Sequence, residues 1–293
     1  MGNFAVSFFE FASISLYPGL IVNIFLKIYQ KSIRVASQLV CPRARRRIVH
    51  SFLPSYEMLV FANEDVGRQI WLFGNYEADE TRFFVEQIQP TDICFDVGGN
   101  VGYFSLLMSR LASDGSVHVF EPIPINAALI AANAALNGIQ NLYLTNAAVG
   151  DREGSVQFSV SVDSAYSSMH ATGRLAEEKS IHVPMITLDD YLSATSLLRI
   201  DVMKVDVEGA EDLVVRGGSS LLTDLSRRPR IILMELFDGN LSSFDSSVAS
   251  VIERMASFGY QPHVLMAGGR RLAPYDLSKH SAFYNIIFLP TAR

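Results

Sequence analysis

The chain has 293 residues, of which 49% are hydrophobic, and a formal net charge of −6. These values suit one large α/β domain with additions, or two small domains, and argue against a disordered chain, because enough apolar surface is present to bury a sizeable core. The two cysteines, Cys41 and Cys94, lie far apart and match neither a zinc motif nor a disulfide framework, which indicates a reducing compartment.

The first 55 residues differ in composition from the rest. The segment Phe4–Leu26 is apolar but contains Glu10 and Pro18, and seven basic residues with no acidic one follow before Glu57. We predict a helical extension that docks on the protein or lies along a membrane through residues 1–50. A spanning helix is the alternative. In both cases we expect a cytoplasmic protein, or one at the cytoplasmic face of a membrane.

The acidic remainder, residues 56–293, is predicted to form the main domain, and its charge argues against nucleic-acid binding. A hairpin of strands over 56–62 and 68–73 leads to a helix over 77–89. Strands and helices then alternate: strands over 92–97, 116–121 and 141–149, with helices over 103–112 and 124–137. This alternation is typical of a mostly parallel sheet with helices on both faces.

The second half continues the alternation after an interruption. Residues 155–191 contain a Ser-rich loop between strand-like runs over 155–162 and 181–187, which we interpret as an insertion over the functional edge of the sheet. Strands over 200–207 and 230–236 and helices over 210–216 and 245–258 follow. The last two strands, over 260–266 and 284–289, have only a loop between them, so we expect one of them to run antiparallel.

The strand over 92–97 ends in a glycine-rich turn with Gly98, Gly99 and Gly102. Glycines allow the backbone to turn sharply and to approach a ligand closely at the carboxyl end of a strand. Asp96 precedes the turn, where its charge would oppose a phosphate and favour an ammonium or sulfonium group. Neither the P-loop pattern nor G-x-G-x-x-G is present. A tight strand-to-helix connection without a ligand is the alternative.

Two further polar residues follow the next strands along the chain. Glu121 ends the strand over 116–121 and is followed by Pro122, a position from which an acid can accept both hydroxyls of a ribose. Asn146 follows the third strand, where it could bind an adenine edge or serve only to form a turn. The predicted ligand is therefore cationic and carries a ribose.

Lys204, Asp206 and Glu208 alternate along a strand and its end, which places them on one face. A cation and two carboxylates at the carboxyl end of a central strand form a candidate catalytic site. Glu211 is interpreted as structural, because an acid is favoured in the first turn of a helix. Glu235 could join the same cleft or could only end its strand. His170 is an alternative base within the Ser-rich loop.

Five segments resemble FkbM-type methyltransferases: 95–105, 119–122, 146–151, 187–191 and 203–211. The resemblance covers roughly residues 75–240. It implies the class I (Rossmann-like) methyltransferase fold with a mostly parallel seven-stranded sheet, and S-adenosyl-L-methionine as the cofactor. Enzymes of this family typically methylate hydroxyl groups on sugars or polyketides. The predicted cofactor site comprises Asp96, Gly98, Gly99, Asn100, Gly102, Glu121, Pro122 and Asn146.

The sequence therefore predicts an O-methyltransferase that acts on a carbohydrate, glycolipid or polyketide, with Asp206, Glu208 and Lys204 as catalytic residues. An alcohol is a poor nucleophile until a base accepts its proton, and either carboxylate could be that base. A divalent cation held by the pair is an alternative, and no metal ligands are assigned. An NAD(P)-dependent oxidoreductase and a non-catalytic, membrane-tethered protein are the competing hypotheses.

Overall fold

The computed structural model describes residues 43–48, 55–161, 178–279 and 285–291. Residues 43–293 form one compact unit, which the description below concerns. The predicted N-terminal helix lies outside the described residues. Within the described residues, no helix is long and apolar enough to span a bilayer.

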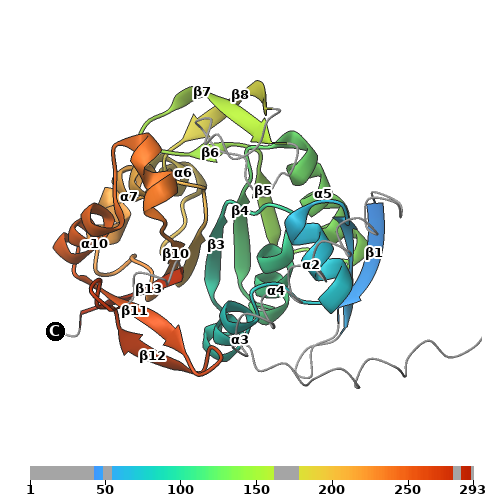
Figure 1. Cartoon of the computed structure of the whole chain (residues 1–293), viewed down its shortest axis with the longest axis horizontal. Helices are drawn as coiled ribbons and strands as arrows, with labels where there is room; N and C mark the ends of the chain where they lie inside the picture. The colour runs from blue at the N-terminus through green and yellow to red at the C-terminus, as the bar shows by residue number, and fades with distance from the viewer. Residues whose placement is uncertain (1–42, 49–54, 162–177, 280–284, 292–293) are drawn as a thin grey trace, which may run out of the picture. The chain divides into compact units, whose positions relative to one another are not determined.

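An eight-stranded sheet forms the centre of this unit (Figure 1), in the order β12-β11-β13-β10-β9-β3-β4-β5. Its strands are β3 (Ile93–Val97), β4 (Ser116–Phe120), β5 (Leu142–Thr145), β9 (Val202–Val205), β10 (Ile231–Glu235), β11 (Tyr260–Met266), β12 (Arg271–Pro274) and β13 (Asn285–Pro290). The five strands from β10 to β5 are parallel, and β13, β11 and β12 are antiparallel. The predicted parallel sheet is thus confirmed, with an eighth strand because β12 folds back on β11.

Helices cover both faces of the sheet, as predicted. One face packs against α2 (Asp65–Phe73), α3 (Ala78–Gln87), α4 (Tyr103–Leu111) and α5 (Pro124–Leu136). The other packs against α6 (Leu188–Thr195), α7 (Glu211–Gly217), α8 (Ser219–Thr223) and α10 (Val248–Ser257). Because side chains alternate along a strand, Cys94 of β3 enters the first core while Phe95 and Val97 enter the second. Central strands buried on both faces explain the continuous apolar runs of the sequence.

A second, three-stranded sheet has the order β6-β8-β7 and consists of β6 (Ala148–Val149), β7 (Gly154–Ser161) and β8 (Glu178–Ile186). It corresponds to the predicted insertion. The strand predicted over 141–149 is interrupted at residues 146–147, so that β5 joins the large sheet and β6 joins the small one. The Ser-rich loop with His170 lies outside the described residues.

The predicted lead-in hairpin is wrong in its second half. The partner of β2 (Tyr56–Phe61) is β1 (Arg43–Ile48), and residues 65–73 form α2. Val66 and Ile70, four residues apart, point from one face of this helix into the core. The compact unit begins with β1 at residue 43.

Between β10 and α10 the chain forms a short helix, α9 (Asp238–Leu241), followed by the 3₁₀ turn η2 (Ser242–Phe244). Leu241 is fully buried in the second core, and Asp238 Oδ1 accepts a hydrogen bond from the Val248 N–H at the start of α10 (2.8 Å). This anchored segment lies directly after the end of β10, where the candidate site begins.

Candidate functional site

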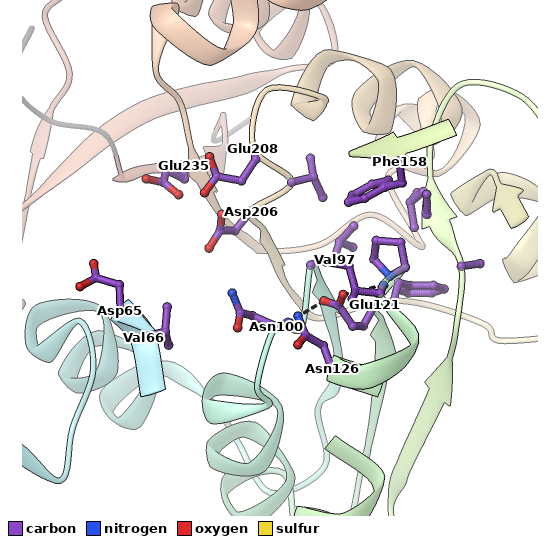
Figure 2. A pocket seen from close by; sticks show the side chains of 18 of the residues that line it. Asp65, Val66, Val97, Asn100, Glu121, Asn126, Phe158, Asp206, Glu208 and Glu235 are labelled. Atoms are coloured by element: carbon purple, nitrogen blue, oxygen red, sulfur yellow. Dashed lines mark hydrogen bonds between the residues drawn. The ribbon is translucent and has the colours of Figure 1, made fainter. Parts of the chain in front are cut away.

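A cavity of about 200 Å³ opens at the carboxyl ends of β3, β4, β9 and β10 (Figure 2). This is the edge at which open parallel sheets bind ligands. Six of the predicted site residues line it: Gly98, Asn100, Glu121, Pro122, Asp206 and Glu208. A smaller cavity of about 20 Å³ adjoins the same turn and is lined by Asp96, Gly99 and Lys204, among others. The structure thus brings most of the predicted residues together.

The glycine turn connects β3 to α4 and packs tightly against the neighbouring strand. The N–H groups of Gly98 and Gly99 both donate to the Phe120 carbonyl oxygen, at 2.9 and 3.1 Å. Gly98 and Gly102 have φ of 90° and 87°, which strongly favours glycine. A Cβ at Gly99 would lie 2.5 Å from Val119 Cγ1, so this glycine serves close helix–strand packing.

Glu121 is buried beside this turn, with 4% of its surface exposed. Its carboxylate oxygens accept hydrogen bonds from the N–H groups of Asn100 and Ile123, each at 2.8 Å (Figure 2 draws the first). Asn126 also hydrogen-bonds the carboxylate. Burial raises the pKa of Glu121 to about 8 despite these donors. A buried carboxyl group in a cavity wall, held by backbone donors, is well placed to accept hydrogen bonds from ligand hydroxyls.

Asp96 and Lys204 occupy neighbouring positions on the adjacent strands β3 and β9. Asp96 is 1% exposed, and its Oδ2 accepts a hydrogen bond from Ser105 Oγ at 2.5 Å. Burial raises the pKa of Asp96, and the charge of Lys204 opposes this shift. Asp96 Oδ1 has no hydrogen-bond partner. The strand register, rather than proximity in sequence, gives the buried acid a nearby cation.

Lys204 Nζ forms an ion pair with Asp206 Oδ2 at 2.8 Å and lies 5.0 Å from the centre of the Phe104 ring. Burial disfavours the charged form of Lys204, but the carboxylates of Asp206, Glu77 and Asp96 together raise its pKa. Burial likewise opposes ionisation of Asp206, yet the Lys204 charge holds the pKa of Asp206 below its usual value. Lys204 therefore keeps Asp206 ionised.

Glu208 and Glu235 complete a carboxylate cluster with Asp206 (Figure 2). One oxygen of each of the three lies within 4.8 Å of the others, a spacing that could hold a divalent cation. The charge of Asp206, then burial, raises the pKa of Glu235 well above its usual value. Asp206 and Glu235 share a hydrogen bond, and the Lys204 charge lowers the pKa of Asp206 while the pKa of Glu235 is raised. Glu235 is therefore the carboxyl of this pair that retains the proton.

The buried acceptor atoms fit a ligand that donates hydrogen bonds. In the part of the chain that the structure describes, six buried side-chain polar atoms have no hydrogen-bond partner. Three of them are oxygens of residues that line the two cavities, namely Asp96 Oδ1, Asn100 Oδ1 and Asn126 Oδ1. Buried polar atoms are normally satisfied. An ammonium group and ribose hydroxyls supply the donors that these three oxygens lack.

Some predicted residues have other positions or roles. Asn146 does not line either cavity, and its Nδ2 donates to the carbonyl oxygens of Glu121 (2.7 Å) and Pro122 (3.0 Å). Gly102 also lies outside both linings and forms the N-cap of α4. Glu211 is structural, as predicted, because its Oε1 accepts from the N–H groups of Val207 and Gly209.

Sequence reasoning missed several residues that line the cavity: Asp65, Tyr76, Asn126 and Phe158. The first two belong to the N-terminal region, where the predicted hairpin hid a helix. Phe158 comes from β7, and only the position of the insertion over the sheet edge could have suggested it. Asn126 follows Glu121 by five residues and lies in an Ala-rich helix. The available signal was a polar residue among these small apolar ones, close to Glu121.

The sheet order, the glycine turn and the acid after β4 define a class I, Rossmann-like methyltransferase. Residues 96–262 match the family model described as the methyltransferase FkbM domain. The chain belongs to this family and is a methyltransferase. The resemblance noted in the sequence is thereby confirmed.

Curated relatives share modest identity with the chain. The 2-O-methyltransferase NoeI of Sinorhizobium fredii is 27% identical over 58% of this chain and 73% of its own length. The 31-O-demethyl-FK506 methyltransferase FkbM of Streptomyces tacrolimicus is 27% identical over 45% of this chain and 61% of its own length. A solved O-methyltransferase of Bacillus cereus, in complex with SAH, is 11% identical, with a TM-score of 0.40 over 75% of this chain and 84% of that one.

Proposed function

We propose that the protein transfers a methyl group from S-adenosylmethionine to a hydroxyl group of a carbohydrate, glycolipid or polyketide. The observation that carries this proposal is that one cavity joins the buried carboxyl of Glu121 to the cluster of Asp206, Glu208 and Glu235. The Glu121 carboxyl suits the hydroxyls of a ribose, and the carboxylate cluster suits an acceptor alcohol that must lose a proton. The cofactor supplies an electrophilic methyl group on a sulfonium.

At the cofactor end, each residue has a role that its surroundings favour. Glu121 would accept hydrogen bonds from the ribose hydroxyls, and Asn126 would hold that carboxylate in place. Asp96 and Asn100 carry unpaired buried oxygens that suit a cationic amino acid portion. Ile123, Ala148 and Phe158 form an apolar part of the lining that suits a purine.

At the other end, the carboxylate cluster supports the transfer chemistry. In an O-methylation the acceptor oxygen bonds to the methyl carbon as the carbon–sulfur bond breaks, and the hydroxyl proton passes to a base. Asp206 is held ionised by Lys204, so it is suited to fix the acceptor hydroxyl. Glu208 is the second candidate for orienting the hydroxyl or accepting its proton. Such positioning supplies much of the rate acceleration.

The names of the relatives support a hydroxyl acceptor. NoeI is named a 2-O-methyltransferase, and FkbM is named for a 31-O-demethyl substrate. At 27% identity these names suggest the type of atom that is methylated and leave the acceptor molecule open. A location in the cytoplasm or at its membrane face is part of the proposal, because S-adenosylmethionine is made in the cytoplasm.

Calorimetry with S-adenosylmethionine, S-adenosylhomocysteine and NADH tests the cofactor. We expect binding of the first two and none of NADH, and the absence of binding by the first two would contradict the proposal. Transfer of a labelled methyl group is then measured with methyl glycosides of neutral sugars and with glycolipid and polysaccharide extracts. Cofactor binding without transfer to any of them would favour a non-catalytic protein.

The Asp206→Asn and Glu208→Gln variants, compared with wild type in EDTA, separate the two roles of the carboxylates. Loss of transfer in either variant with no effect of EDTA supports a base or an orienting group. Loss in EDTA that Mg²⁺ restores supports a cation held by the cluster. Near-normal rates in both variants would exclude the base role.

A further inference from the structure

Glu208 has a backbone conformation that is unusual for its residue type. It lies in the turn between β9 and α7 with φ of 54°, and Gly209 follows with φ of 109°. A non-glycine residue in the left-handed region costs about 1 kcal/mol and persists only where the surroundings hold it. The contacts of this turn therefore indicate what fixes the Glu208 carboxylate at the cavity wall.

Two elements hold the turn from different sides. On one side, Glu211 Oε1 accepts hydrogen bonds from the N–H groups of Val207 (3.2 Å) and Gly209 (3.1 Å). On the other side, Asn240 of α9 donates from Nδ2 to Glu208 Oε2 at 2.7 Å. The backbone of α9 also approaches closely, since a Cβ on Gly209 would lie 2.6 Å from the Asn240 carbonyl oxygen. The missing side chain of Gly209 is thus what allows Asn240 to reach Glu208.

Asn240 itself does not belong to the cavity wall. It is 6% exposed and is absent from the lining of both cavities, whereas Glu208 lines the larger one. Its helix is anchored independently by the buried Leu241 and by the hydrogen bond between Asp238 and the start of α10. Asn240 is therefore a buried donor that acts on the cleft through its hydrogen bond to Glu208.

We propose that Asn240 is a positioning residue that holds the Glu208 carboxylate at the acceptor end of the cleft. This inference rests on the proposed function, in which Glu208 orients or deprotonates the acceptor hydroxyl. Without the amide donor, the carboxylate loses a contact that fixes its orientation relative to Asp206 and Glu235, each of which has one oxygen within 4.8 Å of an oxygen of Glu208. A displaced reacting group can lower the rate on the order of 10²-fold.

The test uses Asn240→Leu, which keeps the side-chain size and removes the donor, and Asn240→Asp, which puts a second carboxylate against Glu208. Crystal structures of both variants with S-adenosylhomocysteine are compared with wild type. Methyl transfer is measured on the methyl glycoside that wild type methylates fastest. We expect a displaced Glu208 side chain and a kcat lowered about 10–100-fold. The KM for S-adenosylmethionine and the affinity for S-adenosylhomocysteine should stay within about twofold of wild type.

Asp238→Ala is the matched control, because it removes the hydrogen bond from α9 to the start of α10 while the buried Leu241 still holds the helix and Asn240 keeps its contact with Glu208. It should lower the melting temperature and leave kcat unchanged. An Asn240→Leu protein with Glu208 in its wild-type position and a normal kcat would overturn the proposal. So would an equal loss of kcat in Asp238→Ala, because the loss would then follow stability and not the contact with Glu208. If wild type transfers no methyl group, the proposed function fails, while the crystal structures still decide the positioning.

Discussion

At the scale of single residues, the protonation of Glu121 predicts how cofactor binding depends on pH. Its pKa is raised to about 8 by burial, so the free protein carries a protonated Glu121 at neutral pH. Ribose hydroxyls donate to the ionised form, so binding below pH 8 requires the loss of this proton. We expect the affinity for S-adenosylhomocysteine to rise with pH, by at most about tenfold per unit, and to level off above about pH 8.

Calorimetry between pH 6 and pH 9 measures this dependence, with Glu121→Gln as the comparison. The variant should bind more weakly at high pH and should lack the rise through pH 8. Parallel profiles for the two proteins would contradict the role of Glu121, because the remaining slope would then come from the ligand.

The burial of Lys204 among carboxylates predicts a large loss of stability when this lysine is replaced. It is 3% exposed and compensates the carboxylates of Asp206 and Asp96, so Lys204→Met leaves buried negative charge without a partner. We expect the free energy of unfolding to fall by about 3–5 kcal/mol, measured by urea denaturation. Adding Asp206→Asn should recover part of the loss.

The ion pair between Arg199 and Asp201 is a matched control for Lys204, because half of the Arg199 side chain is exposed. Arg199→Ala should cost about 1 kcal/mol or less, since solvent screens such pairs. If Lys204→Met and Arg199→Ala lowered the free energy of unfolding equally, burial would not determine the cost of removing the cation.

Sequence patterns predicted Asp96, Glu121, Lys204 and Asp206 because each lies at a regular position on or after a strand. The alternation argument placed Lys204 and Asp206 correctly on one face, and their ion pair follows from it. The same argument also assigned Glu208 to that face, and Glu208 does line the cavity, but it lies beyond the strand in a left-handed turn, where the alternation of a strand no longer applies. Asp65 and Tyr76 could not be predicted, since tertiary packing alone brings them to the cavity.

At the scale of elements, the surroundings of Gly98 predict that the turn after β3 cannot accommodate a side chain. Its φ is 90°, and a Cβ there would overlap the carbonyl oxygen of Asp206, in the turn after β9. Gly138 has φ of 64° with open space around it, so it isolates the conformational cost alone. We expect Gly138→Ala to cost about 1 kcal/mol. Gly98→Ala should cost clearly more and abolish binding of S-adenosylhomocysteine, because the overlap forces the two turns apart.

Thermal unfolding and calorimetry of the two alanine variants check this difference. Similar stability and intact binding in both proteins would mean that the two turns tolerate separation, contrary to the close contact described above.

The elements that the sequence predicted correctly are those with a long and regular pattern. Strands buried on both faces and the amphipathic α10 were recognisable from their residues alone. The run over 68–73 was ambiguous because a short apolar segment suits a strand or a buried helix equally well. The division of 141–149 into β5 and β6 depends on Asn146, whose hydrogen bonds turn the chain from one sheet to the other.

At the scale of the whole molecule, charge predicts which acceptors the cleft excludes. Among the described residues that line the two cavities, Lys204 is the only basic one, and Asp206 already engages it. An acceptor with a carboxylate near the reacting hydroxyl would meet Glu208 and the rest of the cluster without a compensating cation. We expect kcat/KM to be at least about tenfold higher for a methyl glucoside than for the matching methyl glucuronide. Equal values would contradict this preference.

Deleting residues 1–42 separates the function of the cleft from that of the N-terminal extension. Among the residues that the structure describes, those that line the two cavities lie between positions 65 and 235, within the unit that begins at residue 43. The shortened protein should therefore bind S-adenosylhomocysteine with the affinity of the full chain, measured by calorimetry. The deleted segment contains Lys27, Lys31 and Arg34 after an apolar run, so only the full chain should sediment with phosphatidylcholine vesicles that contain phosphatidylserine. Higher salt should weaken this association, because it screens the basic side chains. If both proteins remain in the supernatant, the extension does not bind membranes, and a lipid-linked acceptor loses its support.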